Sequence, residues 1–206
     1  MSYRLLIKKL LMDNNKFVTR EQLKGYCNTL GMSYDSAIGY LLSNDYLTRV
    51  LRGVFYIKNV EERKNKAFDV TFFQAVTEAL RIKKITNWYF GLESAIKLNG
   101  LTHEYFAVDF IISDKLKRPR PIEILGRKVK FLKIKNELTQ FGIRKAEIPY
   151  SDIEKTVLDM AFLGIYNGLS ETEIRSRISD YAKYCSKPKM LKYSKHYPKT
   201  VSRFVQ

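Results

Sequence analysis

A short β-rich stretch, LTRVLRGVFYIKN at residues 47–59, limits the folds that this chain can adopt. Its apolar positions do not follow a helical spacing, and Val, Phe, Tyr and Ile favour strands. Arg52 and Gly53 separate two such runs, at a point where a tight turn needs a residue that accepts a positive φ. The stretch therefore predicts a small hairpin with cationic side chains near its tip.

Three short helical patterns precede this hairpin. Apolar residues repeat at helical spacing over residues 3–12. A second pattern opens at Thr19, where Gln22 completes a capping box, and it stops near Gly31. A third begins around Ser33, and its inner face consists of Ala37, Ile38, Leu41 and Leu42. Helices followed by a hairpin in this order are typical of a winged helix-turn-helix.

In that arrangement the hairpin is the wing, and Arg49 and Arg52 would contact the phosphate backbone beside the groove that the third helix occupies. The outward residues of the helix are small or hydrogen-bonding, so the helix can approach base edges closely. The predicted DNA-binding residues are Ser33, Ser36, Gly39, Tyr40, Ser43, Arg49, Arg52 and Gly53. The alternative is an adaptor, because winged helices also bind proteins.

The net charge favours a polyanionic partner. The chain has 206 residues, 45% of them hydrophobic, and a formal net charge of +16. Self-repulsion of this size gives a globular protein no folding advantage, so the excess charge favours contact with nucleic acid first and an anionic membrane surface second. No apolar run approaches the roughly 20 residues that span a bilayer, so we expect no membrane partner.

A charged segment follows the hairpin. The sequence NVEERKNKAFDV is nearly free of apolar residues up to Ala67, which predicts a linker or the exposed start of a helix. We therefore expect a winged helix-turn-helix domain over residues 1–60, a linker over residues 61–67, and a second domain over residues 68–206. The fold class is α+β.

The second domain begins with helical patterns and continues with strands. Amphipathic helices are predicted in FDVTFFQAVTEALRI and YFGLESAIKLNGL, and the apolar period changes after Thr102. Four apolar or alternating runs up to residue 149 then predict a small, mostly antiparallel sheet with a turn at Gly126. Ser151 with Glu154, and Ser170 with Glu173, predict two further helix starts. The tail over residues 181–206 is basic and interleaved with aromatics, which suits either nucleic-acid contact or a terminal helix.

The cysteines bear on the cellular compartment and on metal binding, and two acidic residues bear on a nuclease activity. Cys27 and Cys185 are the only cysteines, which favours a reducing cytoplasm. They are not closely spaced with each other or with either histidine, so we expect no metal site. A metal-dependent nuclease using Asp109 and Glu123 is an alternative, but Leu125 stands where that chemistry requires a lysine. We expect Asp109 at an edge or in a loop.

The segment DIEKTVLD carries several polar residues at the start of a predicted helix. Glu154 is explained as the partner in its capping box. Lys155 and Asp159 are four residues apart, a spacing that favours an ion pair on the helix surface. Thr156 has no such explanation, which leaves a functional role open.

Motifs in three parts of the chain resemble those of a known family. The matching positions are Arg52, Gly53, Phe55 and Tyr56; Tyr89, Gly91, Leu92, Ser94 and Ala95; and Glu154, Lys155, Thr156 and Asp159. In this order, over roughly residues 1–164, they resemble the AbiEi-type antitoxins of type IV toxin–antitoxin systems. Asn44 and Asp45 stand at the turn into the wing, where the family usually carries glycine.

The resemblance implies a cytoplasmic prokaryotic protein with two roles. Its N-terminal domain would bind inverted repeats in its own promoter and repress transcription. Its C-terminal domain would counteract a cognate toxin that resembles a nucleotidyltransferase, without necessarily binding that toxin directly. We therefore expect a repressor and antitoxin that binds double-stranded DNA, rather than an enzyme, and we expect no cofactor.

Overall fold

The structure, a computed structural model, describes residues 3–13 and 15–205. The chain forms two compact units, which we call the first unit (Met1–Lys84 with Ile124–Gly126) and the second unit (Ile85–Glu123 with Arg127–Gln206). Both contain helices and strands, so the chain has the expected α+β fold. Residues 60–84 belong to the first unit, so the units divide later along the chain than the boundary expected at residues 61–67.

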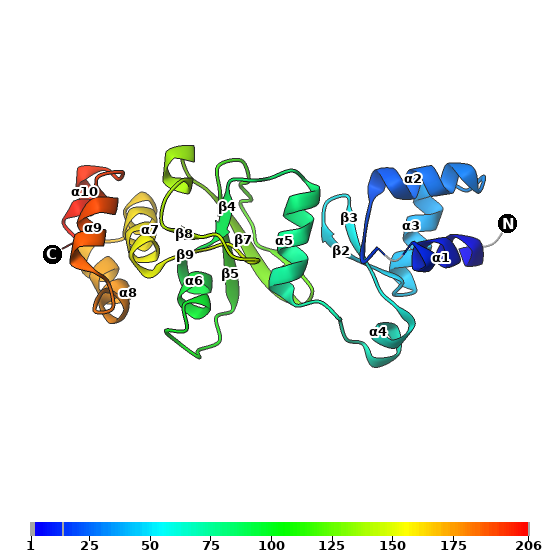
Figure 1. The fold of residues 1–206 in the computed structure, drawn as a ribbon, viewed down its shortest axis with the longest axis horizontal. Helices are drawn as coiled ribbons and strands as arrows, with labels where there is room; N and C mark the ends of the chain where they lie inside the picture. Colours follow the sequence, from blue (N-terminus) through cyan, green and yellow to red (C-terminus); the bar gives the residue numbers. More distant parts are fainter. Residues whose placement is uncertain (1–2, 14, 206) are drawn as a thin grey trace. The chain divides into compact units, whose positions relative to one another are not determined.

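The first unit begins as a winged helix-turn-helix. Its elements are α1 (Tyr3–Met12), β1 (Phe17–Thr19), α2 (Arg20–Thr29), α3 (Tyr34–Ser43), β2 (Leu47–Leu51) and β3 (Val54–Ile57). The three helices lie together beside the β2–β3 hairpin, which is the wing (Figure 1). The strand β1 was not predicted; it pairs antiparallel with β3 and completes a sheet of order β1-β3-β2.

Apolar residues of the three helices form one core with the sheet. Leu6, Leu23 and Leu41, from α1, α2 and α3, are almost fully buried together with Phe55 of the wing. The capping box that opens α2 is confirmed, because the Thr19 side chain accepts a hydrogen bond from the Gln22 backbone N–H and the Gln22 side chain accepts one from the Thr19 backbone N–H. Local sequence signals therefore define the helix starts, and the shared apolar face brings the helices together.

The turn into the wing has Asp45 at a position where the family that the chain resembles usually carries glycine. Asp45 has φ +59°, a left-handed conformation that aspartate adopts more readily than most residues. Its carboxylate forms an ion pair with Lys58, with 2.7 Å between Nζ and Oδ1. This contact ties the start of the wing to the residue that follows β3.

The segment expected as a linker or an exposed helix start forms α4 (Val60–Asn65). Its Glu62 is buried and accepts hydrogen bonds from Tyr56 Oη at 2.6 Å, Asn59 N at 2.8 Å and Asp69 N at 2.7 Å. The Arg63 guanidinium lies 3.6 Å from the centre of the Tyr46 ring. These contacts attach α4 to the wing, and α5 (Phe72–Ile82) also packs on β2 and β3.

The remaining elements of the described residues are the strands of a six-stranded sheet, of order β6-β7-β5-β4-β9-β8, and five helices with one 3-10 turn. They are β4 (Trp88–Phe90), α6 (Leu92–Leu98), β5 (Val108–Ser113), β6 (Ile122–Ile124), β7 (Arg127–Lys133), η1 (Asn136–Thr139), β8 (Ile143–Arg144), β9 (Tyr150–Ser151), α7 (Ile153–Tyr166), α8 (Glu171–Ala182), α9 (Lys187–Ser194) and α10 (Lys199–Ser202). The sheet is mixed rather than mostly antiparallel, because β5 pairs with β7, and β4 with β9, in parallel. The connection over residues 114–126 is long enough for the crossover that a parallel pair needs.

In the second unit, α7 packs with α8, α9 and α10, and Figure 1 shows these four helices together on one side of the sheet. Their core joins Tyr89 and Ile112 of the sheet to Leu158 of α7 and Val201 of α10. The capping box of Ser170 and Glu173 is confirmed at the start of α8. No helix in residues 3–13 or 15–205 is both long and apolar enough to cross a membrane.

Glu62 makes the stability of the first unit depend on pH. Burial alone would raise the pKa of Glu62, but the hydrogen bonds from Tyr56 and from the backbone of Asp69 and Asn59 outweigh it, so its pKa lies below the usual 4.5. A group with a lowered folded-state pKa stabilises the fold above the unfolded pKa. We expect this contribution to disappear as the pH falls through the lower, folded-state pKa.

Replacing Glu62→Gln should therefore lower the free energy of unfolding at neutral pH by about 1–3 kcal/mol. It should also flatten the loss of stability in acid, because the titrating carboxylate is gone. Urea unfolding of the wild type and the variant, from neutral to acidic pH, measures both effects. The control is Glu61→Gln, at an exposed position in the same helix turn, and equal effects of the two variants would contradict the prediction.

Candidate nucleic-acid interface

The wing turn is held against the first residue of α2. Thr19 pairs with Val54 at the end of the β1–β3 ladder, and the Arg20 backbone N–H donates to the Gly53 carbonyl at 3.0 Å. Gly53 has φ +76°, which favours glycine at the turn. A Cβ built on Gly53 would lie 3.6 Å from Arg20 Cβ and 3.5 Å from Lys83 Nζ. The ladder thus brings the wing turn and α2 together, and Lys83, which follows α5, lies beside the same turn.

Cations also surround the first residue of α3. The Arg20 guanidinium lies 5.5 Å, and the Lys24 ammonium 5.8 Å, from the centre of the Tyr34 ring. Burial raises the pKa of Tyr34, and the positive charges of Arg20 and Arg49 act in the opposite direction. Side chains from α2 and β2 therefore meet beside the start of α3.

We call Arg20, Lys24, Arg49, Arg52 and Lys83 the wing-base cations. All five are exposed. Within the described part of the chain, no ion pair joins any of them to a carboxylate. Their charge is consequently available to an anionic ligand, although the Asp35 carboxylate in the first turn of α3 offsets the partial positive charge of that helix N-terminus.

The outward face of α3 agrees with the sequence analysis at four of five positions. Ser33, Ser36, Gly39 and Ser43 are exposed. Ser33 is the N-cap residue but makes no capping hydrogen bond with its side chain. Tyr40 is instead half-buried: its ring stacks on Tyr3, with 4.1 Å between ring centres and 7° between planes. Its role in DNA binding stays a prediction, and its ring also joins α1 to α3.

Three of the wing-base cations, Arg20, Lys24 and Lys83, were not among the DNA-binding residues predicted from the sequence. The position of Arg20 directly after the capping residue Thr19 could have indicated that it begins α2. Because β1 was not predicted, the sequence did not place the start of α2 beside the wing. Lys83 lies still further along the chain, outside the domain where DNA-binding residues were sought.

The DIEKTVLD segment is buried rather than exposed. The capping box predicted for Ser151 and Glu154 is wrong, because Asp152 caps α7 and accepts from the Lys155 backbone at 2.9 Å. Thr156, which the sequence left unexplained, donates to the Asp152 carbonyl at 2.7 Å and lies 2.7 Å from the Ser151 hydroxyl. Local hydrogen bonding accounts for this threonine.

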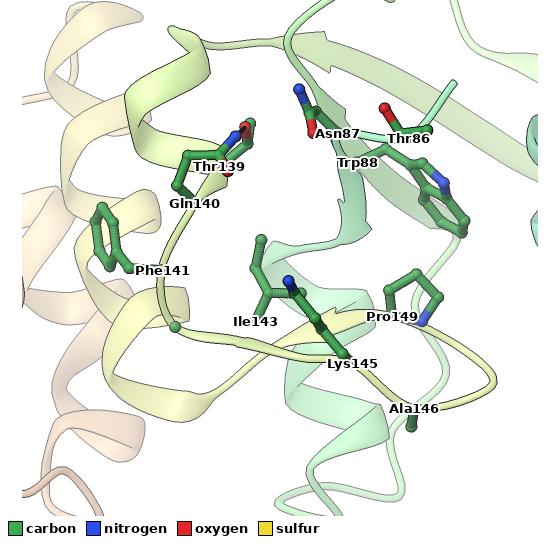
Figure 2. Close-up of a pocket in the computed structure, with 11 residues that line it drawn as sticks. Thr86, Asn87, Trp88, Thr139, Gln140, Phe141, Ile143, Lys145, Ala146 and Pro149 are labelled. Atoms are coloured by element: carbon green, nitrogen blue, oxygen red, sulfur yellow. Dashed lines mark hydrogen bonds between the residues drawn. The ribbon is translucent and has the colours of Figure 1, made fainter. Parts of the chain in front are cut away.

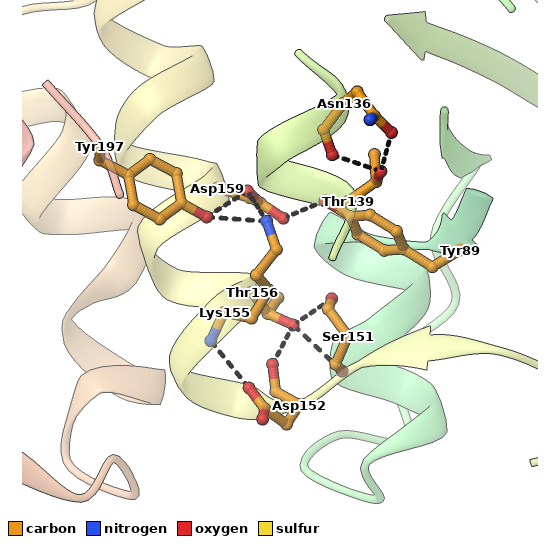
Figure 3. Close-up of polar contacts among 9 residues, drawn as sticks. All are labelled: Tyr89, Asn136, Thr139, Ser151, Asp152, Lys155, Thr156, Asp159 and Tyr197. Carbon is orange, nitrogen blue, oxygen red and sulfur yellow. Dashed lines mark hydrogen bonds and ion pairs between the residues drawn. The ribbon is translucent and has the colours of Figure 1, made fainter. Parts of the chain in front are cut away.

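Lys155 and Asp159 form an ion pair in the protein interior, not on the helix surface as expected. Their side chains are 0% exposed, and 2.6 Å separates Nζ from Oδ1. Figure 3 shows two phenols completing the cluster: Tyr197 donates to Asp159 Oδ1 at 2.6 Å and Tyr89 to Oδ2 at 2.7 Å. Lys155 Nζ also lies 2.8 Å from Tyr197 Oη. We call these four residues the buried ionic cluster.

Burial determines the electrostatics of this cluster. It lowers the pKa of Lys155, while the neighbouring Asp159 carboxylate opposes that shift. Burial, and then the charge of Asp159, raise the pKa values of Tyr89 and Tyr197 well above the usual value. Both phenols therefore stay protonated and donate to Asp159, which satisfies the buried carboxylate.

The start of α7 contacts the basic C-terminal segment. Glu154 accepts from the Ser186 backbone at 3.0 Å, and Lys189 Nζ lies 2.9 Å from both Asp152 Oδ2 and Glu154 Oε2. Tyr193 donates to Asp152 at 3.0 Å. Of the predicted basic tail, residues 181–205 are described and residue 206 lies outside the described residues. Several of its aromatic rings pack inside the unit, so they are not free to stack on bases.

In the second of the three motifs, which runs from Tyr89 to Ala95, close packing explains Gly91 and a buried carboxylate explains Ser94. A Cβ on Gly91 would clash with the Ile112 side chain. Ser94 donates to Asp109 Oδ1 at 2.9 Å, and Arg127 lies 2.7 Å from Asp109 Oδ2. Asp109 is thus buried on β5, between β4 and β7, and not at an edge or in a loop. Glu123, its proposed partner, is exposed on β6.

The contacts of the buried ionic cluster predict that removing the Tyr197 hydroxyl group destabilises the fold. Tyr197→Phe should lower the free energy of unfolding by about 1–3 kcal/mol, because Asp159 and Lys155 lose a buried partner. Tyr184→Phe is the matched control, since Tyr184 is 58% exposed, and it should change stability by less than about 0.5 kcal/mol. Urea unfolding measures both, and similar values for the two variants would contradict a stabilising role for the cluster.

Comparison with known proteins gives a fold likeness only. The sequence matches no family model and no curated protein. Among solved structures, the chain is similar to the RV2827C protein from Mycobacterium tuberculosis, with a TM-score of 0.65 and 15% sequence identity. The match covers 97% of this chain and 73% of that chain. At this identity the two proteins share a fold, and function has to be argued from the residues described above.

Proposed function

We propose that this protein is a cytoplasmic, sequence-specific regulator that binds double-stranded DNA through its winged helix-turn-helix. The observation that carries the proposal is the meeting of Arg20, Lys24 and Arg49 around the first residue of α3. In a winged helix-turn-helix, α3 is the recognition helix and lies in the major groove. Cations beside its start would then face the phosphates that border the groove.

Affinity and specificity come from different residues in this proposal. The wing-base cations neutralise phosphates and supply most of the affinity, which makes binding strongly dependent on salt. Ser33, Ser36 and Gly39 are exposed and small, so the helix backbone can approach base edges. The hydroxyl groups can donate to or accept from a base, and they supply the sequence preference.

The second role is that of an antitoxin that counteracts a nucleotidyltransferase-like toxin, with or without direct contact. It rests on the resemblance of the motifs around Tyr89 and Glu154 to those of AbiEi-type antitoxins. A structural observation supports treating these motifs together: Tyr89 of one motif donates to Asp159 of the other at 2.7 Å. Residues far apart in the sequence thus maintain one fold in the second unit.

The DNA-binding role predicts opposite behaviour for cations and serines. Arg20→Ala and Arg52→Ala should each weaken binding to all duplexes similarly, and each should reduce the slope of log K against log salt by about 1. Ser36→Ala should keep the slope and change the preference among sequences. Mobility-shift titrations at several salt concentrations, with the chain's own upstream region and an unrelated duplex, measure these effects.

Arg175→Ala is a suitable control, because Arg175 is exposed but already paired with Glu171 in the second unit. It should leave the salt slope unchanged. Tyr40→Phe tests the remaining predicted contact, since it removes the hydroxyl and keeps the ring stacked on Tyr3. Equal binding of the wild type to both duplexes, or an unchanged slope in both arginine variants, would contradict the proposal.

The antitoxin role predicts rescue from toxicity in cells. Co-expression with a nucleotidyltransferase-like protein encoded next to this chain should restore growth, and Arg52→Ala should still rescue if the second unit carries the activity. Growth curves with inducible genes measure this outcome. Failure of the wild type to rescue from such a neighbour would refute the second role and leave the regulatory role standing.

A further inference from the structure

A cavity of about 380 Å³ opens in the second unit (Figure 2). Three segments line it: residues 86–88 at the start of β4, residues 139–143 around the end of η1, and residues 145, 146 and 149 between β8 and β9. Its volume is within the range of small-molecule sites. The buried ionic cluster does not line it, and no residue of the winged helix-turn-helix does.

Two carboxamides, those of Asn87 and Gln140, line the cavity. Asn87 Nδ2 donates to Asp114 Oδ2 and to Asn136 Oδ1, both at 3.0 Å. Gln140 Nε2 donates to the same Asn136 oxygen at 2.9 Å. These bonds fix both amide groups, and within the described residues no hydrogen bond uses the side-chain oxygen of either carboxamide, Asn87 Oδ1 or Gln140 Oε1. The cavity therefore favours a ligand with N–H donors.

The charge of the lining favours an anionic ligand. Lys145 lines the cavity and is exposed, and no aspartate or glutamate is among the lining residues. No ion pair in residues 3–13 and 15–205 involves Lys145. An ammonium group without a carboxylate partner can bind a phosphate at the rim of the cavity.

Apolar walls and a fixed backbone complete the site. Trp88, Ile143 and Pro149 line the cavity, and Figure 2 shows Trp88 and Pro149 across from Gln140 with Ile143 between the two sides. The Pro149 carbonyl accepts from the Phe90 backbone at 2.9 Å, so this wall is joined to the sheet. A preformed cavity loses little conformational entropy on binding, and flat walls of this kind suit a planar ring.

We propose that this cavity binds a mononucleotide whose base carries an exocyclic amine. The base occupies the space beside Trp88, its N–H groups donate to the carbonyl oxygens of Asn87 and Gln140, and its phosphate contacts Lys145. A base with an amine fits these acceptors better than uracil, which lacks one. The inference is independent of DNA binding, because the cavity and the wing-base cations share no residue.

Trp88 is the only tryptophan of the chain, so intrinsic fluorescence reports on this cavity. We would titrate the full chain with AMP, UMP, adenosine and inorganic phosphate, and repeat each titration by calorimetry. AMP should give a saturable signal, UMP and adenosine should bind more weakly, and phosphate alone should bind weakest. Lys145→Ala should weaken AMP binding roughly fivefold to tenfold, the effect of one charge-assisted contact, and leave adenosine binding unchanged.

Two further variants separate the base contact from bulk charge. Gln140→Leu, at an exposed position, should weaken AMP and adenosine alike. Lys192→Ala removes an exposed lysine of α9 that lies outside the cavity lining, and it should change nothing. The proposal is overturned if millimolar AMP gives neither heat nor a fluorescence change, if phosphate binds as tightly as AMP, or if Lys192→Ala acts like Lys145→Ala.

Discussion

The antiparallel pairing of β1 with β3 is the constraint on which the proposed interface depends. It ends at Thr19 and Val54, and the next hydrogen bond joins Arg20 of α2 to Gly53 of the wing turn. Without β1, the wing would be a two-stranded hairpin, which is marginally stable by itself. The three-stranded sheet fixes the wing beside α2, and this brings Arg20 and Arg49 to the start of α3.

The second unit depends on a different kind of contact, the buried ionic cluster. A buried ion pair is weak evidence for stability, because desolvation offsets its attraction, but removing one partner is costly. Tyr89 comes from the sheet and Tyr197 from the C-terminal segment, so Asp159 connects parts that are distant in sequence. Lys189 of the tail pairs with Asp152 and Glu154 at the start of α7, so these contacts and the buried Tyr197 attach the C-terminal segment to that helix.

Sequence reasoning succeeded where the determinant is local and failed where it is not. The helices of the first unit, the wing and the capping boxes at Thr19 and Ser170 follow from short spacings and were confirmed. The burial of Lys155 could not be predicted, because its i, i+4 spacing to Asp159 also suits an exposed pair. Likewise, β1 is three residues long, and the parallel pairing of β5 with β7 depends on a crossover that no local pattern encodes.

Hydrogen exchange of the protein, measured with and without a DNA duplex from the region upstream of its gene, tests the central claim most directly. If the wing-base cations and α3 bind DNA, exchange should slow at the first turns of α2 and α3 and at the wing turn, since these amides lie beside the proposed phosphates. Slower exchange confined to the second unit, or unchanged exchange at all three places while the complex forms, would contradict the account.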